Sequence, residues 1–230
     1  MTIRYLMFDF FGTLVQYRER VAENPTDRSI RYLQSLGVEI TGSEFSSRFQ
    51  RVWDAVDHEA RLSLRETHVH QAATRLFFSL GLSISESQIA EFSAQFIEDW
   101  SEGVLAIDGL PDMLDRIHLP SCIVSNTHSP SLVPSLVERF GLKHCFERII
   151  TSIDHGYRKP HSSIYQTALQ AAGVPPAEVL FVGDNPECDY HAPRRMGMQA
   201  VLISESKHDG VDERDRLSKV TDLLEFLVDK

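Results

Sequence analysis

The sequence has few cysteines, no long apolar run and little positive charge, and each shortage excludes a class of protein. Its three cysteines, Cys122, Cys145 and Cys188, form no C-x-x-C pair, so their spacing predicts neither a zinc site nor a redox dithiol. No apolar run approaches the length that crosses a bilayer, and an acidic residue follows the first residues too soon for a signal peptide. We therefore expect a cytoplasmic protein without a membrane segment.

Positive charge is scarce, because 23 lysine and arginine residues stand against 33 aspartate and glutamate residues, for a formal net charge of −10. An acidic chain gains no affinity for nucleic acid from counterion release, and anionic membrane surfaces repel it. We expect neither partner. The sequence does not indicate an oligomeric state.

Five short apolar runs predict buried parallel strands, because each is largely continuous rather than alternating. They are residues 3–10, 122–125, 148–152, 179–182 and 200–203. Helical patterns separate the last four runs. One opens at Ser129-Pro130, a second spans 162–172, and a third spans about 188–196 with Pro193 inside it. Strands that alternate with helices favour right-handed crossovers and a Rossmann-like, parallel α/β sheet.

A long stretch without strand signals, about residues 16–102, interrupts this rhythm after the first run. Four amphipathic helical patterns fill it: they begin at Thr26, after Ser43, at Val69, and at a capping box of Ser85 and Gln88. The sequence therefore predicts an α/β core of residues 1–15 and 104–230, and an inserted helical bundle of residues 16–103. A polar surface loop is expected at 207–216 and a terminal helix at 221–228.

Polar residues follow the predicted strands, and an open parallel sheet binds its ligands at these carboxyl ends. Asp9 ends the first strand, Ser125-Asn126 ends the second, Lys159 lies in the loop after the third, and Asp184 and Asp189 follow the fourth. Three crowded carboxylates raise one another's pKa, and a divalent cation relieves this repulsion. Oxygen ligands without histidine or cysteine favour Mg²⁺.

The same residues suit the hydrolysis of a small anionic substrate. A carboxylate nucleophile such as Asp9 divides a hydrolysis into two easier displacements. We expect Lys159 to orient this nucleophile and pair with the substrate, and Ser125 to donate a hydrogen bond to a phosphoryl oxygen. Backbone N–H groups around Phe10, Phe11 and Asn126 add an anion-binding nest.

Together these residues resemble the haloacid dehalogenase-like superfamily. Its D-x-D-x-T motif matches residues 9–13 except at Phe11, its serine or threonine after the second strand matches Ser125, and its lysine before proline matches Lys159. Its G-D-x-x-x-x-D motif matches residues 183–189. The resemblance spans most of the chain, and the helical bundle resembles the family's inserted cap domain.

The resemblance implies a role for each matching residue. Asp9 is the nucleophile, and Asp9, Asp184 and the backbone carbonyl of Phe11 hold Mg²⁺, with Asp189 as a further ligand or as the group that orients a metal-bound water. Thr13 and Ser125 hydrogen-bond Asp9 or the substrate, and Lys159 orients the nucleophile. The expected substrate-binding residues are Phe10, Phe11, Gly12, Asn126 and Lys159.

Phe11 departs from the family's phosphatases, which usually carry an aspartate there to protonate the leaving group and activate water. Without it, turnover of ordinary phosphomonoesters is expected to fall by about 10²–10⁴-fold. An aromatic residue at this position resembles the 2-haloacid dehalogenases, whose halide leaves without a proton. The dehalogenases lack the Gly-Asp metal motif that this chain retains at Gly183-Asp184, so phosphate chemistry is favoured, on a substrate with a good leaving group.

Three hypotheses therefore remain open. The leading one is a Mg²⁺-dependent phosphatase that acts on a small phosphorylated metabolite through an aspartyl-phosphate. The second is a dehalogenase-type hydrolase; phosphonate cleavage through a Schiff base is disfavoured, because residues 16–102 contain no lysine. The third is a catalytically weak binding protein on the same fold. His128, His155 and His161 lie near the predicted site, and one of them is a candidate to replace the missing acid.

Overall fold

The computed structural model describes residues 2–17 and 26–228. The chain divides into two compact units, one formed by Met1–Gln16 and Ala106–Lys230 and the other by Tyr17–Leu105. The strands β2 (Val15–Tyr17) and β3 (Val104–Ala106) form a small sheet through which the chain leaves the first unit and returns to it. The sequence analysis did not predict either of these short strands.

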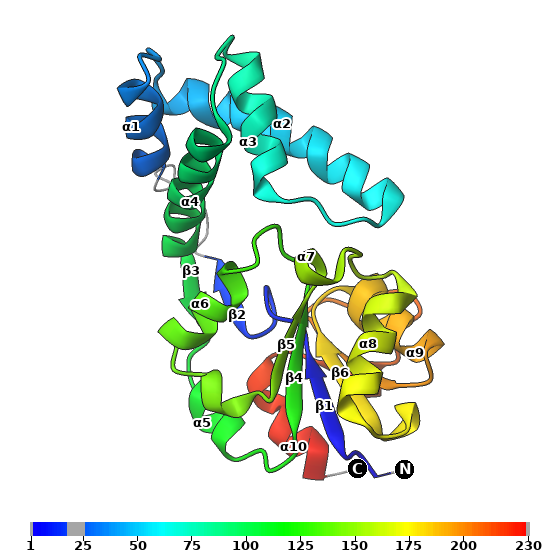
Figure 1. Cartoon of the computed structure of the whole chain (residues 1–230). Coiled ribbons are helices and arrows are strands. Elements are labelled where there is room, and N and C mark those ends of the chain that lie inside the picture. The colour runs from blue at the N-terminus through cyan, green and yellow to red at the C-terminus, as the bar shows by residue number, and fades with distance from the viewer. Residues whose placement is uncertain (1, 18–25, 229–230) are drawn as a thin grey trace. The chain divides into compact units, whose positions relative to one another are not determined.

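The first unit contains a six-stranded parallel sheet in the order β5-β4-β1-β6-β7-β8. Its strands are β1 (Tyr5–Phe8), β4 (Ser121–Ser125), β5 (Arg148–Thr151), β6 (Val179–Gly183), β7 (Gln199–Ile203) and β8 (Arg216–Leu217). The Rossmann-like α/β prediction is confirmed, and β1 lies at the centre of the sheet between β4 and β6 (Figure 1).

Helices cover both faces of this sheet, which is why its strands are apolar on both sides. Figure 1 shows α8 (Ser162–Ala172) and α9 (Ala192–Arg195) on one side, and α5 (Leu110–Asp115) and α6 (Leu132–Arg139) on the other. Met7 of β1 belongs to the buried cluster that also contains Ile164 and Ala168 of α8. Both faces therefore contribute to the core, and functional side chains must lie at the strand ends.

Four of the five predicted strands are reproduced within about one residue at each end, but the first is shorter than its apolar run. The run 3–10 contains the strand Tyr5–Phe8, and Asp9 comes directly after it. The predicted polar loop at 207–216 is incorrect at its end. Asp215 there is buried, and Arg216 begins the edge strand β8. The terminal helix α10 (Leu223–Val228) is preceded by a short 3-10 turn.

Several helices of the first unit begin elsewhere than predicted. The helix α6 starts at Leu132 with Ser131 as its N-cap residue, so Ser129-Pro130 lies before the helix. The helix α5 and the short α7 (Ser152–His155) were not predicted. The pattern at 188–196 resolves into a π-helix, Pro186–His191, followed by α9, whose second residue is Pro193. Proline fits there because the first helical turn leaves its N–H groups unpaired.

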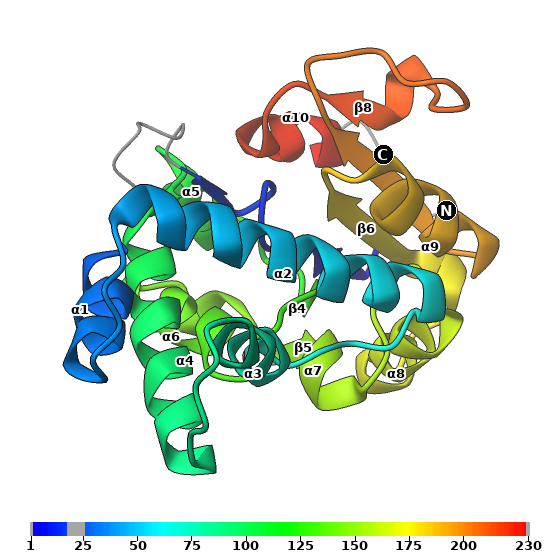
Figure 2. The same cartoon turned by 90° about the horizontal axis from the view of Figure 1, so that it is seen from above.

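The second unit contains four helices: α1 (Asp27–Ser35), α2 (Gly42–Ser63), α3 (Val69–Ser79) and α4 (Glu86–Glu102). Figure 2 shows α1 beside α4 and the long α2 beside α3. Their apolar stripes enclose a separate core that includes Leu33, Phe45, Leu76 and Phe92. The aromatic residues of these helices pack against one another, as predicted from their spacing.

The predicted starts of the helices in this unit are partly confirmed. The capping box of Ser85 and Gln88 is confirmed at α4. The helix α2 begins at Gly42 rather than after Ser43, and its N-cap residue, Thr41, forms a capping box with Glu44. Thr26 is the N-cap residue of α1, but its side chain makes no capping hydrogen bond. Among the described helices, none is both long and apolar enough to cross a bilayer.

Candidate active site

The candidate site lies where the carboxyl ends of β1, β4 and β6 meet. Asp9 follows β1, and its backbone N–H donates to the carbonyl of Val182 in β6 at 2.9 Å. Ser125 is the last residue of β4, and Asp184 follows the last residue of β6. Adjacent parallel strands therefore bring these three positions, distant in sequence, to one end of the sheet.

Lys159 lies in the loop between α7 and α8 and joins two of the carboxylates. Its Nζ atom donates to Asp9 Oδ1 and to Asp189 Oδ1, each at 2.7 Å. The side chains are buried, with 2% of Lys159, 9% of Asp9 and 1% of Asp189 exposed. The same Nζ lies 5.2 Å from the centre of the Phe181 ring, a cation–π distance. Lys159 thus contacts Asp9 directly, and its role in orienting a nucleophile stays a prediction.

The negative charges of Asp9 and Asp189 affect the pKa of Lys159. Burial by itself lowers the pKa of Lys159, but the negative charges of Asp189 and Asp9 outweigh burial and hold it above its usual value. Lys159 therefore remains an ammonium ion at neutral pH. A buried ion pair of this kind costs a large desolvation energy, so its value is in fixing geometry more than in adding stability.

Asp9, Asp184 and Asp189 form an acidic cluster in which one carboxylate oxygen of each lies within 4.8 Å of the others. Burial, and then the charge of Asp9, raises the pKa of Asp184 to about 6. Burial also raises the pKa of Asp189, which Lys159 opposes. Three carboxylate groups thus lie near one ammonium group, so the cluster carries more negative than positive charge. This donor set of close, partly buried oxygens fits a hard divalent cation such as Mg²⁺.

The turn after β1 is shaped to approach this cluster. Gly12 has a φ of +85°, and a Cβ atom there would lie 2.2 Å from Asp184 Oδ2. A glycine is therefore required for both backbone conformation and space. One residue further, Thr13 Oγ1 donates to Asp9 Oδ2 at 3.3 Å. Lys159 and Thr13 thus hold the two carboxylate oxygens of Asp9 separately.

Ser125 and Asn126, predicted as substrate-contacting residues, both make contacts within the protein, and the predicted substrate contact of Asn126 stays a prediction. Asn126 receives the backbone N–H of Lys159 at its Oδ1 (2.7 Å) and donates its Nδ2 to the carbonyl of Lys159 (3.0 Å). The amide side chain therefore fixes the lysine's backbone. Ser125 Oγ donates to the carbonyl of Asn126 at 3.4 Å, a long bond. Its predicted bond to a phosphoryl oxygen stays a prediction.

Three residues determine the position of Asp189, and the sequence analysis predicted this role for none of them. The backbone N–H of Asn185 donates to Asp189 Oδ2 at 3.0 Å. A Cβ atom on Gly183 would lie 2.4 Å from the Cβ of Asp189, so this position also requires glycine. Tyr165 of α8 donates its hydroxyl to the carbonyl of Cys188, the preceding residue. Buried aromatic residues in helices are usually core, so sequence alone gave no signal for Tyr165.

Neither Asp184 nor Asp189 caps the helix that follows β6. The N-cap residue of the π-helix Pro186–His191 is Asn185, whose side chain accepts from the N–H groups of Glu187 and Cys188. The carboxylate of Asp189 accepts from Lys159 and from the backbone N–H of Asn185. The capping function is therefore filled by Asn185.

Phe11 places an aromatic ring at the position where the family's phosphatases usually carry an aspartate. The ring packs edge to face on Phe10, with the centroids 5.0 Å apart, and Phe10 is completely buried. Any contribution of Phe10 to substrate binding must therefore come from its backbone. The proposed metal contact of the Phe11 carbonyl stays a prediction.

Two of the three histidines considered as a replacement acid contact the same serine. His155 Nε2 and His161 Nδ1 each lie 2.7 Å from Ser163 Oγ, and His161 is also the N-cap residue of α8. Burial, and then the charge of His161, lowers the pKa of His155. These contacts give both histidines a structural role at the start of α8.

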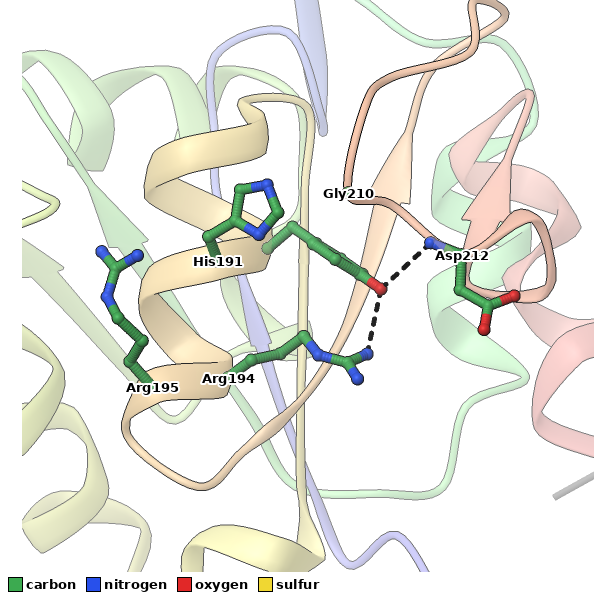
Figure 3. Close-up of a pocket in the computed structure, with 6 residues that line it drawn as sticks. His191, Arg194, Arg195, Gly210 and Asp212 are labelled. Atoms are coloured by element: carbon green, nitrogen blue, oxygen red, sulfur yellow. Dashed lines mark hydrogen bonds between the residues drawn. The ribbon is translucent and has the colours of Figure 1, made fainter.

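A cavity of about 470 Å³ has a lining that includes none of the residues of the acidic cluster. It is lined by Tyr190, His191, Arg194, Arg195, Gly210 and Asp212 (Figure 3). Its cationic groups are engaged, since Arg194 bonds Tyr190 and Asp215, and Arg195 pairs with Glu187. The cavity therefore presents little free positive charge, and we assign it no function.

Comparison with known proteins agrees with this geometry. The family model described as haloacid dehalogenase-like hydrolase matches residues 3–197. The chain is 26% identical over 215 residues to the human haloacid dehalogenase-like hydrolase domain-containing protein 3, which covers 88% of this chain and 82% of that protein. It is 35% identical to the phosphoserine phosphatase of Thermus thermophilus over 88 residues, 38% of this chain and 35% of that one.

Solved structures share the fold. The 2-haloacid dehalogenase of Pseudomonas syringae pv. Tomato DC3000 superposes with a TM-score of 0.73 at 18% identity, over 99% of each chain. At this identity the likeness concerns the fold.

Proposed function

Since the chain belongs to the haloacid dehalogenase-like hydrolases, we propose that it is a Mg²⁺-dependent phosphatase acting on a small phosphorylated metabolite. The observation that carries the proposal is the acidic cluster of Asp9, Asp184 and Asp189 beside the ammonium group of Lys159. Negative charge in excess of one lysine favours a bound divalent cation, and such a cation suits a phosphoryl substrate better than a haloalkanoate.

The proposed reaction has two displacements at phosphorus. A carboxylate oxygen of Asp9 forms a bond to phosphorus while the phosphorus–ester oxygen bond breaks and the leaving oxygen takes the electron pair. Water then attacks phosphorus, the bond to Asp9 breaks, and phosphate is released with the Asp9 carboxylate restored. Bound Mg²⁺ would supply positive charge to neutralise the transferring group. Lys159 and Thr13 hold the two oxygens of Asp9, which reduces the cost of aligning it.

Phe11 narrows the proposed substrate class. A phenyl ring neither donates a proton to the leaving oxygen nor takes one from water. The substrate therefore needs a leaving group that is stable without protonation, such as the carboxylate of an acyl phosphate, an enolate or a phenolate. The partial match to a phosphoserine phosphatase supports phosphate chemistry but concerns 38% of this chain.

The test is phosphate release from a panel that includes acetyl phosphate and alkyl phosphates, with Mg²⁺ and with EDTA. We expect Mg²⁺-dependent release from at least one compound, loss of activity in Asp9→Asn, and normal activity in Asp112→Asn, which changes an exposed aspartate of α5. If no compound in the panel releases phosphate, the phosphatase proposal is wrong.

Phe11 also favours a second candidate, a 2-haloacid dehalogenase-type hydrolase, because a halide needs no proton to leave. In that reaction the Asp9 oxygen attacks carbon, the carbon–halogen bond breaks, and water hydrolyses the resulting ester. Halide release from 2-chloropropionate that persists in EDTA would support this candidate. Its absence with and without Mg²⁺ would exclude it and leave the phosphatase proposal in place.

A further inference from the structure

A second cluster of metal-ligating side chains lies at the opposite end of β4 from the candidate active site. Asp115 ends α5, and His144 and Cys145 belong to a 3-10 turn, Lys143–Cys145, before β5. Ser121, the first residue of β4, donates its hydroxyl to the carbonyl of Cys145 at 2.8 Å, whereas the active-site end of β4 is Ser125. Figure 1 shows α5 toward the end of the sheet from which β1 starts.

The three ligand atoms are spaced as a tetrahedral metal ion would hold them. His144 Nε2 lies 2.8 Å from Asp115 Oδ1 and 3.4 Å from Cys145 Sγ, and Cys145 Sγ lies 3.9 Å from Asp115 Oδ1. Tetrahedral zinc with ordinary bond lengths requires about 3.3 Å between nitrogen and oxygen, and about 3.6 Å for each edge that includes sulfur. All three distances are within about half an ångström of these values, so small side-chain adjustments suffice.

The contacts do not form the relay of a cysteine nucleophile. In such a relay the histidine uses one ring nitrogen for the thiol and the other for the carboxylate. Here the same atom, His144 Nε2, faces both Asp115 and Cys145. One ring nitrogen carries either one proton or one lone pair, so it satisfies one partner at a time. A shared cation satisfies all three at once.

We propose that Asp115, His144 and Cys145 form a zinc(II) site. A thiolate, an imidazole and a carboxylate are the ligand types that zinc accepts, and two negative ligands balance its charge. Three protein ligands leave a fourth tetrahedral position for water or an external ligand, and the side chains of His144 and Asp115 are 65% and 57% exposed. Binding would join the end of α5 to the turn before β5. The spacing of the cysteines did not predict a zinc site, because only one cysteine takes part and Asp115 lies 29 residues from His144 in the sequence.

The experiment is titration of the full chain with Co²⁺, a spectroscopic substitute for zinc, in excess Mg²⁺ so that the oxygen-only active site is filled. We expect a thiolate-to-cobalt charge-transfer band that saturates at about one Co²⁺ per chain and is removed by Zn²⁺. The Cys145→Ser variant should lack the band, and Cys188→Ser should retain it. Absence of the band in the parent protein, or its persistence in Cys145→Ser, would overturn the proposal.

Two further variants keep the test valid if Cys145→Ser fails to fold. His144→Asn and Asp115→Asn alter exposed side chains, and each should weaken Co²⁺ binding at least about tenfold, because a ligand contributes no less than the groups that merely orient ligands. His58→Asn, which changes an exposed histidine of α2, should bind as the parent does. Equal affinity in the parent, His144→Asn and Asp115→Asn would contradict the proposed ligand set.

Discussion

The ammonium group of Lys159 lies 2.7 Å from Oδ1 of Asp9, although 150 residues separate the two positions in the chain. This pair is buried and includes Asp189, so the ammonium ion is surrounded by two carboxylates. Whatever the substrate, the pair fixes the orientation of the proposed nucleophile. The first prediction concerns the removal of this ion pair.

Replacing Lys159 by methionine should destabilise the protein strongly. It leaves Asp9 and Asp189 buried without their cation, and removing one partner of a buried ion pair costs about 3–5 kcal/mol. Urea unfolding in EDTA measures the free energy of unfolding. Lys143→Met, which alters an exposed lysine, is the control and should change it by less than about 0.5 kcal/mol. Equal stabilities of the two variants would show that the ion pair is not as buried as described.

Replacing Gly12 by alanine should impair Mg²⁺ binding. The new Cβ atom would overlap Asp184 Oδ2, displacing one carboxylate of the acidic cluster. Gly37→Ala is a matched control, because Gly37 has nearly the same φ, +84°, with no atom within 4 Å of the added Cβ. Both variants should lose about 1 kcal/mol through backbone strain. We expect Mg²⁺ to raise the Tm of the parent and of Gly37→Ala, but not of Gly12→Ala; a normal shift in Gly12→Ala would refute the clash.

The stabilising effect of Mg²⁺ should depend on pH. Burial raises the pKa of Asp184 to about 6, above its unfolded value of 3.8. The protonated form is therefore favoured by folding, and this stability is present below the unfolded pKa and lost as pH rises through about 6. Mg²⁺ binds the ionised form, so its shift in Tm should be larger at about pH 8 than at about pH 5. Asp184→Asn should reduce this difference, and a shift independent of pH in the parent would contradict the prediction.

Asn126 should act as a positioning residue rather than as a substrate ligand. Its side chain holds both backbone groups of Lys159, so Asn126→Ala leaves buried polar groups unpaired at a cost of about 1–3 kcal/mol. We expect kcat to fall while KM and Mg²⁺ affinity change little. A rise in KM at unchanged kcat would instead place the Asn126 amide on the substrate, as the sequence first suggested.

Introducing a carboxylate at position 11 should broaden the range of leaving groups. In Phe11→Asp, alkyl phosphate turnover should rise by up to about 10²-fold through general acid–base catalysis, while acetyl phosphate, whose leaving group needs no proton, should change little. Phe11→Asn removes the ring without adding an acid and is the matched control. Equal behaviour of the two variants would mean that position 11 does not reach the leaving group.

The sequence predicts the strand ends well because each buried strand is a continuous apolar run that stops at a polar residue. Asp9 and Asp184 were located in this way, and parallel strand order then brings them together. The start of α2 was misplaced, although the spacing from Thr41 to Glu44 carries the capping-box pattern. The contact of the Asn126 amide with the backbone of Lys159 was not predicted, because nothing in the local sequence indicates which backbone segment this amide contacts.

Other features depend on contacts that no local pattern encodes. Tyr165 supports the residue before Asp189 from a different helix. The zinc ligands proposed at Asp115, His144 and Cys145 meet across the start of β4, and their spacing matches no familiar motif. Asp215 belongs to a segment whose polar composition suggested an exposed loop. It forms an ion pair with Arg194, with a nitrogen–oxygen distance of 2.8 Å. Each of these features requires knowledge of which segments become neighbours.

The most direct test of the proposed nucleophile is covalent trapping on Asp9. The protein is mixed with acetyl phosphate and Mg²⁺, quenched in acid within the first turnover, and digested for mass spectrometry. We expect one phosphoryl group on the carboxylate of Asp9, formed with Mg²⁺, absent in EDTA and absent in Asp9→Asn. Phosphate release without any phosphoryl group on Asp9, or undiminished release by Asp9→Asn, would contradict the mechanism.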